Sequence, residues 1–324
     1  MQTVQGISHG LRVESAGSAR AGGGLRRLGQ RFGLVLTLVV LTGCGSLPSS
    51  KPQEPSPPAA ERREVRLGLA LGGGAARGFA HVGVIQVLEE AGLRPSHVAG
   101  TSAGSLVAAL YASGKTPAEL VRVAESMQEA EITDWMLPIL NRGALRGEAL
   151  AKYVNTQVGG KTMEQMQIPL GIVATDLGSG QAITFRRGNT GAAVRASSAV
   201  PAVFQPVRLG DREYVDGGLV SPVPVRQTRE MGANFVIAVD ISSDPEGNPY
   251  GDTFQILMQT FAIMGKSINT LALKEADLVI RPVLAGIKSA DFSARLRSIE
   301  AGRVAMRAAL PALKVRLAQF EEGR

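Results

Sequence analysis

The feature that most constrains this chain is the segment at residues 100–104, Gly-Thr-Ser-Ala-Gly. An apolar run precedes it, and residues 105–111 have the composition of a helix. A serine two residues from a glycine on either side, between a strand and a helix, is the nucleophile-elbow pattern. Such a turn is so tight that Gly100 and Gly104 would crowd each other if either carried a side chain. The alternative is an ordinary helix start in which Thr101 or Ser102 caps the first turn.

The elbow would hold the Ser102 hydroxyl out of the turn and at the beginning of a helix. The amino end of a helix favours negative charge, which stabilises an attacking alkoxide and the oxyanion that its attack creates. This sequence therefore indicates a nucleophilic serine.

A glycine-rich loop, residues 72–78, lies between a predicted strand at 65–71 and a predicted helix at 79–91. A dinucleotide-binding fingerprint is excluded, because Arg77 stands where its last glycine is required. A P-loop is excluded as well, because Phe79 and Ala80 replace its lysine and hydroxyl residue. The remaining interpretation is a nest of backbone N–H groups at a helix start, which binds an anion. If the strand at 98–101 neighbours the strand at 65–71, this nest lies beside Ser102 as an oxyanion hole, with Arg77 near it.

Asp216 follows a predicted strand and precedes two glycines, Gly217 and Gly218. A carboxylate in this position is fixed by the backbone and can enter a crowded site, although an ordinary turn aspartate has the same appearance. Together with the elbow and the nest, the pattern favours a catalytic role for Asp216. Asp176 also ends a predicted strand, but it stands at a turn that an aspartate would cap in any case.

These motifs resemble those of the patatin-like phospholipase family, in its bacterial branch related to neuropathy target esterase. The resemblance extends over roughly residues 66–310 and includes the segments at 170–180, 196–207, 216–218 and 231–240. It implies a serine–aspartate dyad without histidine, formed by Ser102 and Asp216. It also implies that the oxyanion-binding amides lie near Gly73, Gly74 and Ala75, where plant members carry a further glycine in place of Ala75.

The first part of the chain has the composition of a leader. Residues 1–43 combine five arginines with a ten-residue apolar run, too short to span a bilayer, and end before Cys44, the one cysteine in the sequence. Leu-Thr-Gly-Cys resembles the lipobox of bacterial lipoproteins, which implies cleavage before a lipid-bearing Cys44. The alternative is a signal peptide with an incidental cysteine. Residues 44–64 hold five prolines and are expected to form a disordered tether to a domain at 65–324. Gly45, by the same resemblance, implies the outer membrane of a diderm cell.

The expected fold is α/β, with three layers and a mostly parallel central sheet. A Met-rich helix at 253–274 is expected to pack in the core, and the alternative is contact with acyl chains. A helix at 292–320, broken at Pro311, is expected to have a basic face that is solvated, or else attracted to a membrane. Trp135, Met136 and Leu137 are expected either to pack in a connector or to form an apolar lip over the site.

The expected function is hydrolysis of acyl esters of lipids, without a metal or an organic cofactor. His81 is expected to pack or face solvent, and His97 to lie at the far end of the incoming strand, so neither reaches Ser102. The net charge is +7, and residues 1–43 supply much of it. The charge of the remaining chain is close to balance, so it carries no signature of nucleic-acid binding. Two alternatives remain open: acyl transfer to another lipid by the same residues, and a non-catalytic lipid-binding module. The oligomeric state is not predicted.

Overall fold

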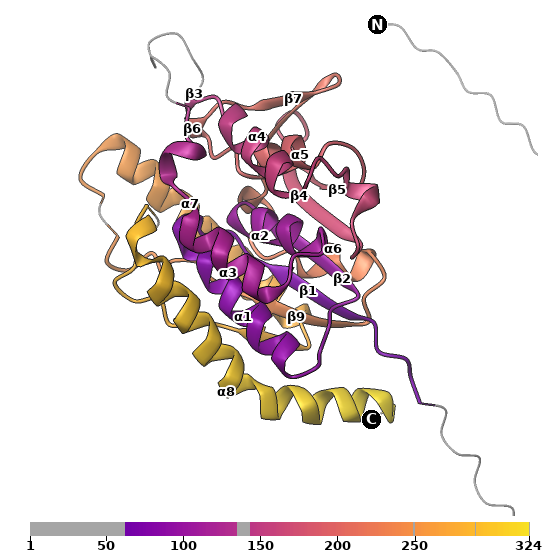
Figure 1. The fold of residues 1–324 in the computed structure, drawn as a ribbon. Helices are drawn as coiled ribbons and strands as arrows, with labels where there is room; N and C mark the ends of the chain where they lie inside the picture. The colour runs from indigo at the N-terminus through magenta and orange to yellow at the C-terminus, as the bar shows by residue number, and fades with distance from the viewer. Residues whose placement is uncertain (1–61, 135–142, 249, 289, 324) are drawn as a thin grey trace, which may run out of the picture. The chain divides into compact units, whose positions relative to one another are not determined.

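Five parallel strands form the centre of the sheet, in the order β10-β9-β1-β2-β4 (Figure 1). The computed structural model describes residues 62–134, 143–248, 250–288 and 290–323, all within the unit Pro58–Arg324. In chain order these strands are β1 (Leu67–Leu71), β2 (His97–Thr101), β4 (Leu170–Asp176), β9 (Phe235–Val239) and β10 (Leu278–Ile280). Their residues are almost all buried, as expected of strands covered on both faces.

Antiparallel strands complete the other side of the sheet. β8 pairs with β4 and with β7, and β5 forms a hairpin with β4. A separate two-stranded ribbon joins β3 and β6. These elements are β3 (Gly143–Leu145), β5 (Ala182–Phe185), β6 (Ala202–Phe204), β7 (Val207–Leu209) and β8 (Arg212–Asp216).

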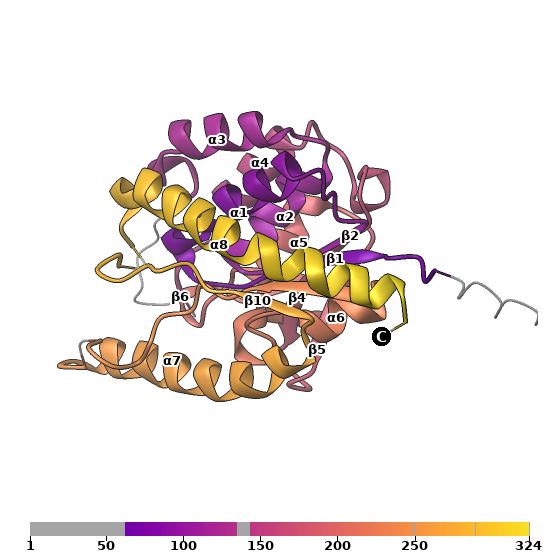
Figure 2. The same cartoon turned by 90° about the horizontal axis from the view of Figure 1, so that it is seen from below.

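Helices cover both faces of the sheet, which gives three layers (Figure 2). One face carries α1 (Phe79–Glu90), α2 (Ala103–Ala112), α3 (Pro117–Ser126), α4 (Glu148–Gln157), α5 (Thr190–Ser197) and α8 (Arg295–Glu321). The other face carries α6 (Val225–Glu230) and α7 (Thr253–Ala272). Short 3-10 turns η1 (Ala75–Gly78), η2 (Glu129–Glu131), η4 (Met163–Gln165), η5 (Gly217–Leu219), η6 (Leu273–Glu275) and η7 (Phe292–Ala294) link several of them.

The largest buried cluster lies under α1, α2 and α8, and includes Leu69, Leu71 and Ile85. α1 is buried on nearly all sides, because α8 crosses its outer surface. This packing requires small residues where the two backbones meet. A side chain at Gly83 would overlap the Ile299 carbonyl, and one at Gly302 would overlap the Ala80 carbonyl.

The predicted α/β fold is confirmed: five strands of the sheet are parallel, and the antiparallel strands β5, β7 and β8 adjoin them. Two local expectations are wrong. α8 continues through Pro311, whose side chain is exposed and clears the protein interior. α7 is not a core helix, because the only residue on it that is fully buried is Asn269. The predicted leader, Cys44, almost all of the tether and Trp135, Met136 and Leu137 lie outside the described residues.

Candidate active site

The turn between β2 and α2 is the tightest part of the sheet edge. A Cβ on Gly100 would overlap the Gly104 carbonyl, and a Cβ on Gly104 would overlap the Leu71 carbonyl of β1. Ser102, between them, has φ 54° and ψ −124°. A residue other than glycine with such angles costs on the order of 1–3 kcal/mol, and such strain gathers at functional sites. The strained backbone presents a half-buried serine at the amino end of a ten-residue helix.

The glycine-rich loop lies directly against this turn. β1 pairs in parallel with β2, with Leu71 opposite Gly100, so the two strands deliver their following loops to the same place. A Cβ on Gly73 would come within 3.1 Å of the Ser102 Cβ, and one on Gly78 within 2.8 Å of the Ala103 Cβ. The absence of side chains on these glycines allows the loop to approach the serine so closely.

The backbone amides of the glycine-rich loop differ in whether they are already hydrogen-bonded within the protein. The Gly73 amide donates to the Pro222 carbonyl at 3.0 Å, so it is not a free donor. The amides of Gly74 and Ala75 have no acceptor among the described residues. The structure therefore narrows the candidate oxyanion hole to Gly74 and Ala75. Ala75 has φ 49°, in the left-handed region that glycine favours, rather than the negative φ of an ordinary residue.

Arg77 lies on the same loop but is not among the residues that line the cavity beside Ser102. Its half-buried guanidinium has an Nε atom without a hydrogen-bond partner among the described residues. Desolvation lowers the pKa of Arg77, and the nearby negative charge of Asp240 opposes this shift. The positive charge of Arg77 therefore interacts with the carboxylate of Asp240, which directly follows β9.

Asp216, at the end of the antiparallel strand β8, lies at the same edge of the sheet as Ser102. Thr101 of β2 pairs with Val173 of β4, and the next residue, Ala174, pairs with Asp216 of β8. The backbone of Asp216 is fixed on both sides, because its amide donates to the Ala199 carbonyl and its carbonyl accepts from the Thr175 hydroxyl. Its carboxylate thereby faces the elbow across one intervening strand.

The carboxyl of Asp216 is buried and only partly satisfied. Oδ1 accepts from the Gly218 amide at 2.7 Å, whereas Oδ2 has no partner at full hydrogen-bonding geometry among the described residues. Burial raises the pKa of Asp216 to about 6, although the adjacent Ser102 hydroxyl and the Gly218 amide lower it. A carboxylate with this pKa is a better proton acceptor than an exposed aspartate.

Three residues to which the sequence assigned no part in this site fix its backbone. The Ser197 hydroxyl accepts from the Ser102 amide at 2.9 Å and donates to the Val173 carbonyl. The Thr101 hydroxyl donates to the Ser221 carbonyl, which ties the elbow to the loop after Asp216. The third is His81, whose Nε2 lies 2.8 Å from the Gly72 carbonyl. Their role is to position the backbone around Ser102.

Neither histidine of the described chain is placed to act as a base. His81 is fully buried, burial lowers its pKa to about 4, and its Nε2 is engaged by Gly72. His97 begins β2, so it lies about 13 Å or more from the serine that follows this strand, at ~3.3 Å per residue. The expectation that His81 packs is correct, and the structure adds that it holds the glycine-rich loop.

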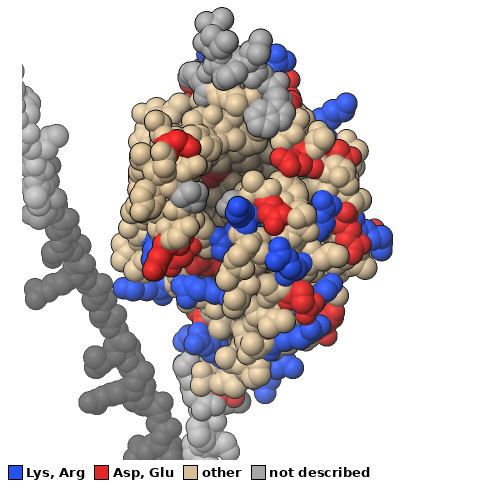
Figure 3. Space-filling model, turned by 90° about the vertical axis from the view of Figure 1, so that its left-hand side faces the viewer, with Lys and Arg blue, Asp and Glu red and all other residues tan. Residues whose placement is uncertain are grey.

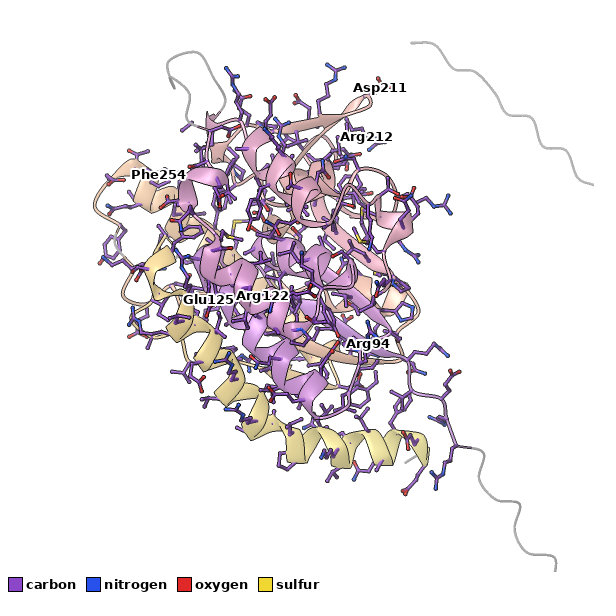
Figure 4. The ribbon with its side chains drawn as sticks, in the orientation of Figure 1. Arg94, Arg122, Glu125, Asp211, Arg212 and Phe254 are labelled. Atoms are coloured by element: carbon purple, nitrogen blue, oxygen red, sulfur yellow. The ribbon has the colours of Figure 1, made fainter. Side chains whose placement is uncertain are left out.

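Asp176, the other strand-end carboxylate, has a different environment. Its Oδ1 accepts from the amides of Gly178 and Ser179, and Arg212 binds Oδ2 at 2.5 Å. These contacts, Arg212 first, lower the pKa of Asp176. Arg212 begins β8 at the hairpin tip labelled in Figure 4. Asp176 therefore caps a turn and holds the hairpin.

An apolar cavity of 260 Å³ opens from Ser102 into the layer of helices. Successive turns of α2 line it through Leu106 and Leu110, which lie about 6 and 12 Å along the helix from Ser102 at ~1.5 Å per residue. α3 closes it with Leu120 and Ala124, and Leu150 of α4 also lines it. The cavity therefore offers the serine a dry channel with almost no polar groups.

Comparison with known proteins identifies the domain. Residues 69–229 match the family model of patatin-like phospholipases. The chain contains a patatin-like phospholipase domain. An uncharacterised NTE family protein of Mycobacterium tuberculosis is 38% identical over 183 residues, which are 56% of this chain and 51% of that protein. The chain spans about half the length of these curated relatives.

More distant relatives agree with this assignment. The mouse patatin-like phospholipase domain-containing protein 6 is 30% identical over 232 residues, 69% of this chain and 16% of that protein. VipD from Legionella pneumophila is similar in structure, with a TM-score of 0.53 and 16% identity over 78% of this chain and 68% of that chain. The second likeness shows that the patatin fold is shared.

The burial of Asp216 predicts an unusual effect of its removal on stability. Its pKa of about 6 exceeds the ordinary 3.8, so ionisation opposes folding, and this cost grows as pH rises from about 4 to about 6. Asp216→Asn is expected to raise the free energy of unfolding at pH 8 by up to ~3 kcal/mol, and by little at pH 4. Urea unfolding at both pH values measures this difference.

Asp176→Asn is the matched control, because the pKa of Asp176 is lowered in the folded state. This variant should have a lower free energy of unfolding than the parent at pH 8. The difference should shrink as the pH falls below 3.8, the ordinary pKa of an aspartate. An Asp216→Asn variant that is less stable than the parent at pH 8 would contradict the assignment of a buried, poorly satisfied carboxylate.

Proposed function

We propose that this protein is a serine ester hydrolase that acts on lipids, of the phospholipase A or lysophospholipase type. The observation that carries the proposal is the meeting of Ser102 and the buried carboxyl of Asp216 at the mouth of an apolar cavity. A nucleophile beside a base of raised pKa, with unpaired amides next to it, is the arrangement that acyl transfer requires. The relatedness to patatin-like phospholipases supports the same conclusion.

In the proposed mechanism the Ser102 hydroxyl attacks the ester carbonyl while Asp216 accepts its proton. The carbonyl oxygen becomes an oxyanion, which the free amides of Gly74 and Ala75 stabilise together with the amino end of α2. The tetrahedral intermediate then collapses, and the alcohol leaves with the proton held by Asp216. Water, deprotonated by the same carboxylate, then attacks the acyl group. The fatty acid is released as the proton passes from Asp216 to the Ser102 oxygen.

The dyad predicts a specific pattern of activity on a panel of p-nitrophenyl esters and phospholipids. Ser102→Ala and Asp216→Asn should each reduce kcat/KM by several orders of magnitude in folded protein, because each removes a reacting group. The parent should lose activity as the pH falls through about 6, where Asp216 takes up a proton and ceases to be a base.

Two control variants accompany this test. Asp176→Asn should keep most of the activity, since Asp176 is engaged by Arg212 away from the elbow. His97→Ala should do the same. A folded His97 variant as inactive as Ser102→Ala would show that the dyad is wrong, and the appearance of acylated alcohols in place of free fatty acid would show transfer instead of hydrolysis.

The cavity predicts a preference for long acyl chains, since each buried methylene contributes ~0.8 kcal/mol. Ala124→Leu adds volume to the wall that α3 contributes to the cavity, so kcat/KM for long-chain esters should fall several-fold while that for acetyl esters changes little. Ala118→Leu makes the same change on the exposed side of α3 and should leave the profile unaltered. Equal rates for acetyl and long-chain esters in the parent would contradict this use of the cavity.

We also propose that the mature chain begins at a lipid-bearing Cys44 and resides at the cell envelope, on the periplasmic side of the outer membrane in a diderm cell. The motif Leu41-Thr42-Gly43-Cys44 after a short apolar run supports this proposal. Cys44→Ala should block processing, so the unprocessed precursor accumulates on an immunoblot. Mature parent protein without added lipid mass, measured by mass spectrometry, would disprove it.

A further inference from the structure

α7 is the most apolar exposed element among the described residues. Its 20 residues extend about 30 Å at ~1.5 Å per residue. Together with η6 it is long and apolar enough to cross a membrane by composition, yet only 11% of its most apolar window is buried in the protein. A helix at the surface of a soluble domain normally presents charged residues outward.

The outward face of α7 carries large apolar side chains instead. Ile256, Ile263, Met264 and Leu271 are each between 46% and 67% exposed, and Phe254, on another side of the first turn, is 51% exposed. Ile256, Ile263 and Leu271 are seven and eight residues apart, so they fall on one stripe along the helix. We call this stripe, with Met264, the α7 face.

The side chains of the α7 face are uncharged, so this face suits an uncharged binding partner. Between Asp252 and Lys274 the only ionisable side chain is Lys266, and it pairs with Asp244 at 3.0 Å. A protein partner recognised by charge would find no unpaired group along these five turns. Hydrocarbon has the complementary property, because it carries no charge to be satisfied.

The polar side chains on α7 are also adapted to an apolar neighbour. The hydroxyls of Thr260, Ser267 and Thr270 each donate to the backbone carbonyl four residues earlier. Serine and threonine use this bond in membrane helices, because it satisfies the hydroxyl without water. The exposed surface of α7 therefore contains little that requires hydration.

The position of α7 connects it to the active site. The helix contacts η5, which follows Asp216, and Gly265 lies close to Pro222, whose carbonyl holds Gly73. The first turn of α7, with Phe254, lies on the side of the molecule where β3 and β6 contribute to the cavity (Figures 1 and 4). Figure 3 views this side and shows a hollow with acidic and basic residues near its rim.

We propose that the α7 face binds the surface of a lipid bilayer, with the helix in the plane of the interface. Contact through α7, which packs against η5 directly after Asp216, would hold the domain at the surface that contains its lipid substrate. This inference rests on the proposed lipid hydrolase activity for its purpose, but the binding of α7 to a bilayer is a separate physical property. Helices with an apolar stripe bind interfaces through the apolar area that they bury.

A fluorescent label tests the contact directly. In the proposed mature chain (residues 44–324) carrying Cys44→Ala, Ile263→Cys and Val315→Cys each introduce one thiol for an environment-sensitive fluorophore. The two sites are 51% and 57% exposed and lie on opposite faces of the sheet, on α7 and α8. When vesicles of phosphatidylcholine and phosphatidylglycerol are added, the fluorescence emission of the label at residue 263 should shift to shorter wavelength and brighten several-fold. The emission of the label at residue 315 should not change in this way.

Either of two results would overturn the proposal. One is the same response at both positions, or at neither. The other is a blue shift at 263 that rises with protein concentration in the absence of vesicles, which would show that a second copy of the chain covers α7.

Activity gives an independent readout. Ile263→Asp combined with Leu271→Asp places two charges on the α7 face, and hydrolysis of vesicle lipids should fall about tenfold or more. Hydrolysis of a water-soluble short-chain ester should stay within about twofold of the parent, because neither residue lines the cavity. Val304→Asp with Val315→Asp, at comparably exposed sites on α8, should change neither rate. A parent that hydrolyses no ester would refute the proposed function, while the labelling experiment would still decide the role of α7.

Discussion

The active-site region depends on how closely three backbone segments approach one another at the end of β1 and β2. Gly100 and Gly104 flank Ser102, and the end of β1 lies against Gly104 so closely that any side chain there would overlap the Leu71 carbonyl. This approach forces Ser102 into its strained conformation and brings the following glycine-rich loop against it. The positions of the candidate nucleophile and of its candidate oxyanion donors thus follow from one steric constraint.

A second constraint is electrostatic. Asp216 is held by backbone hydrogen bonds on both sides, and its carboxyl is placed where only one oxygen finds a donor. Burial without full satisfaction costs stability, and the same burial raises the pKa of Asp216 to about 6. A carboxyl group in this state is the proton acceptor that the proposed dyad requires.

The sequence was sufficient to predict the parallel core and the approach of the glycine-rich loop to Ser102, because these follow from a strand–loop–helix–strand unit with glycines at fixed spacing. It was not sufficient to predict contacts made across the fold. Ser197 lies 95 residues from the amide that it binds, and the partner of the Gly73 amide is Pro222. The Met-rich pattern of α7 favoured a core helix over contact with acyl chains, and the core interpretation is wrong, because periodicity indicates an apolar face without indicating what covers it.

The parallel topology explains why the features of this domain gather on one side. The loops after β1 and β2 emerge at the same edge of the sheet, and the antiparallel β8 brings Asp216 to that edge from the opposite direction. Above the sheet, α2 and α3 enclose a channel that starts at Ser102. Below it, α7 packs against η5, the turn that directly follows Asp216. The cavity and α7 therefore lie on opposite faces of the sheet, and both adjoin segments that meet at the edge where Ser102 and Asp216 lie.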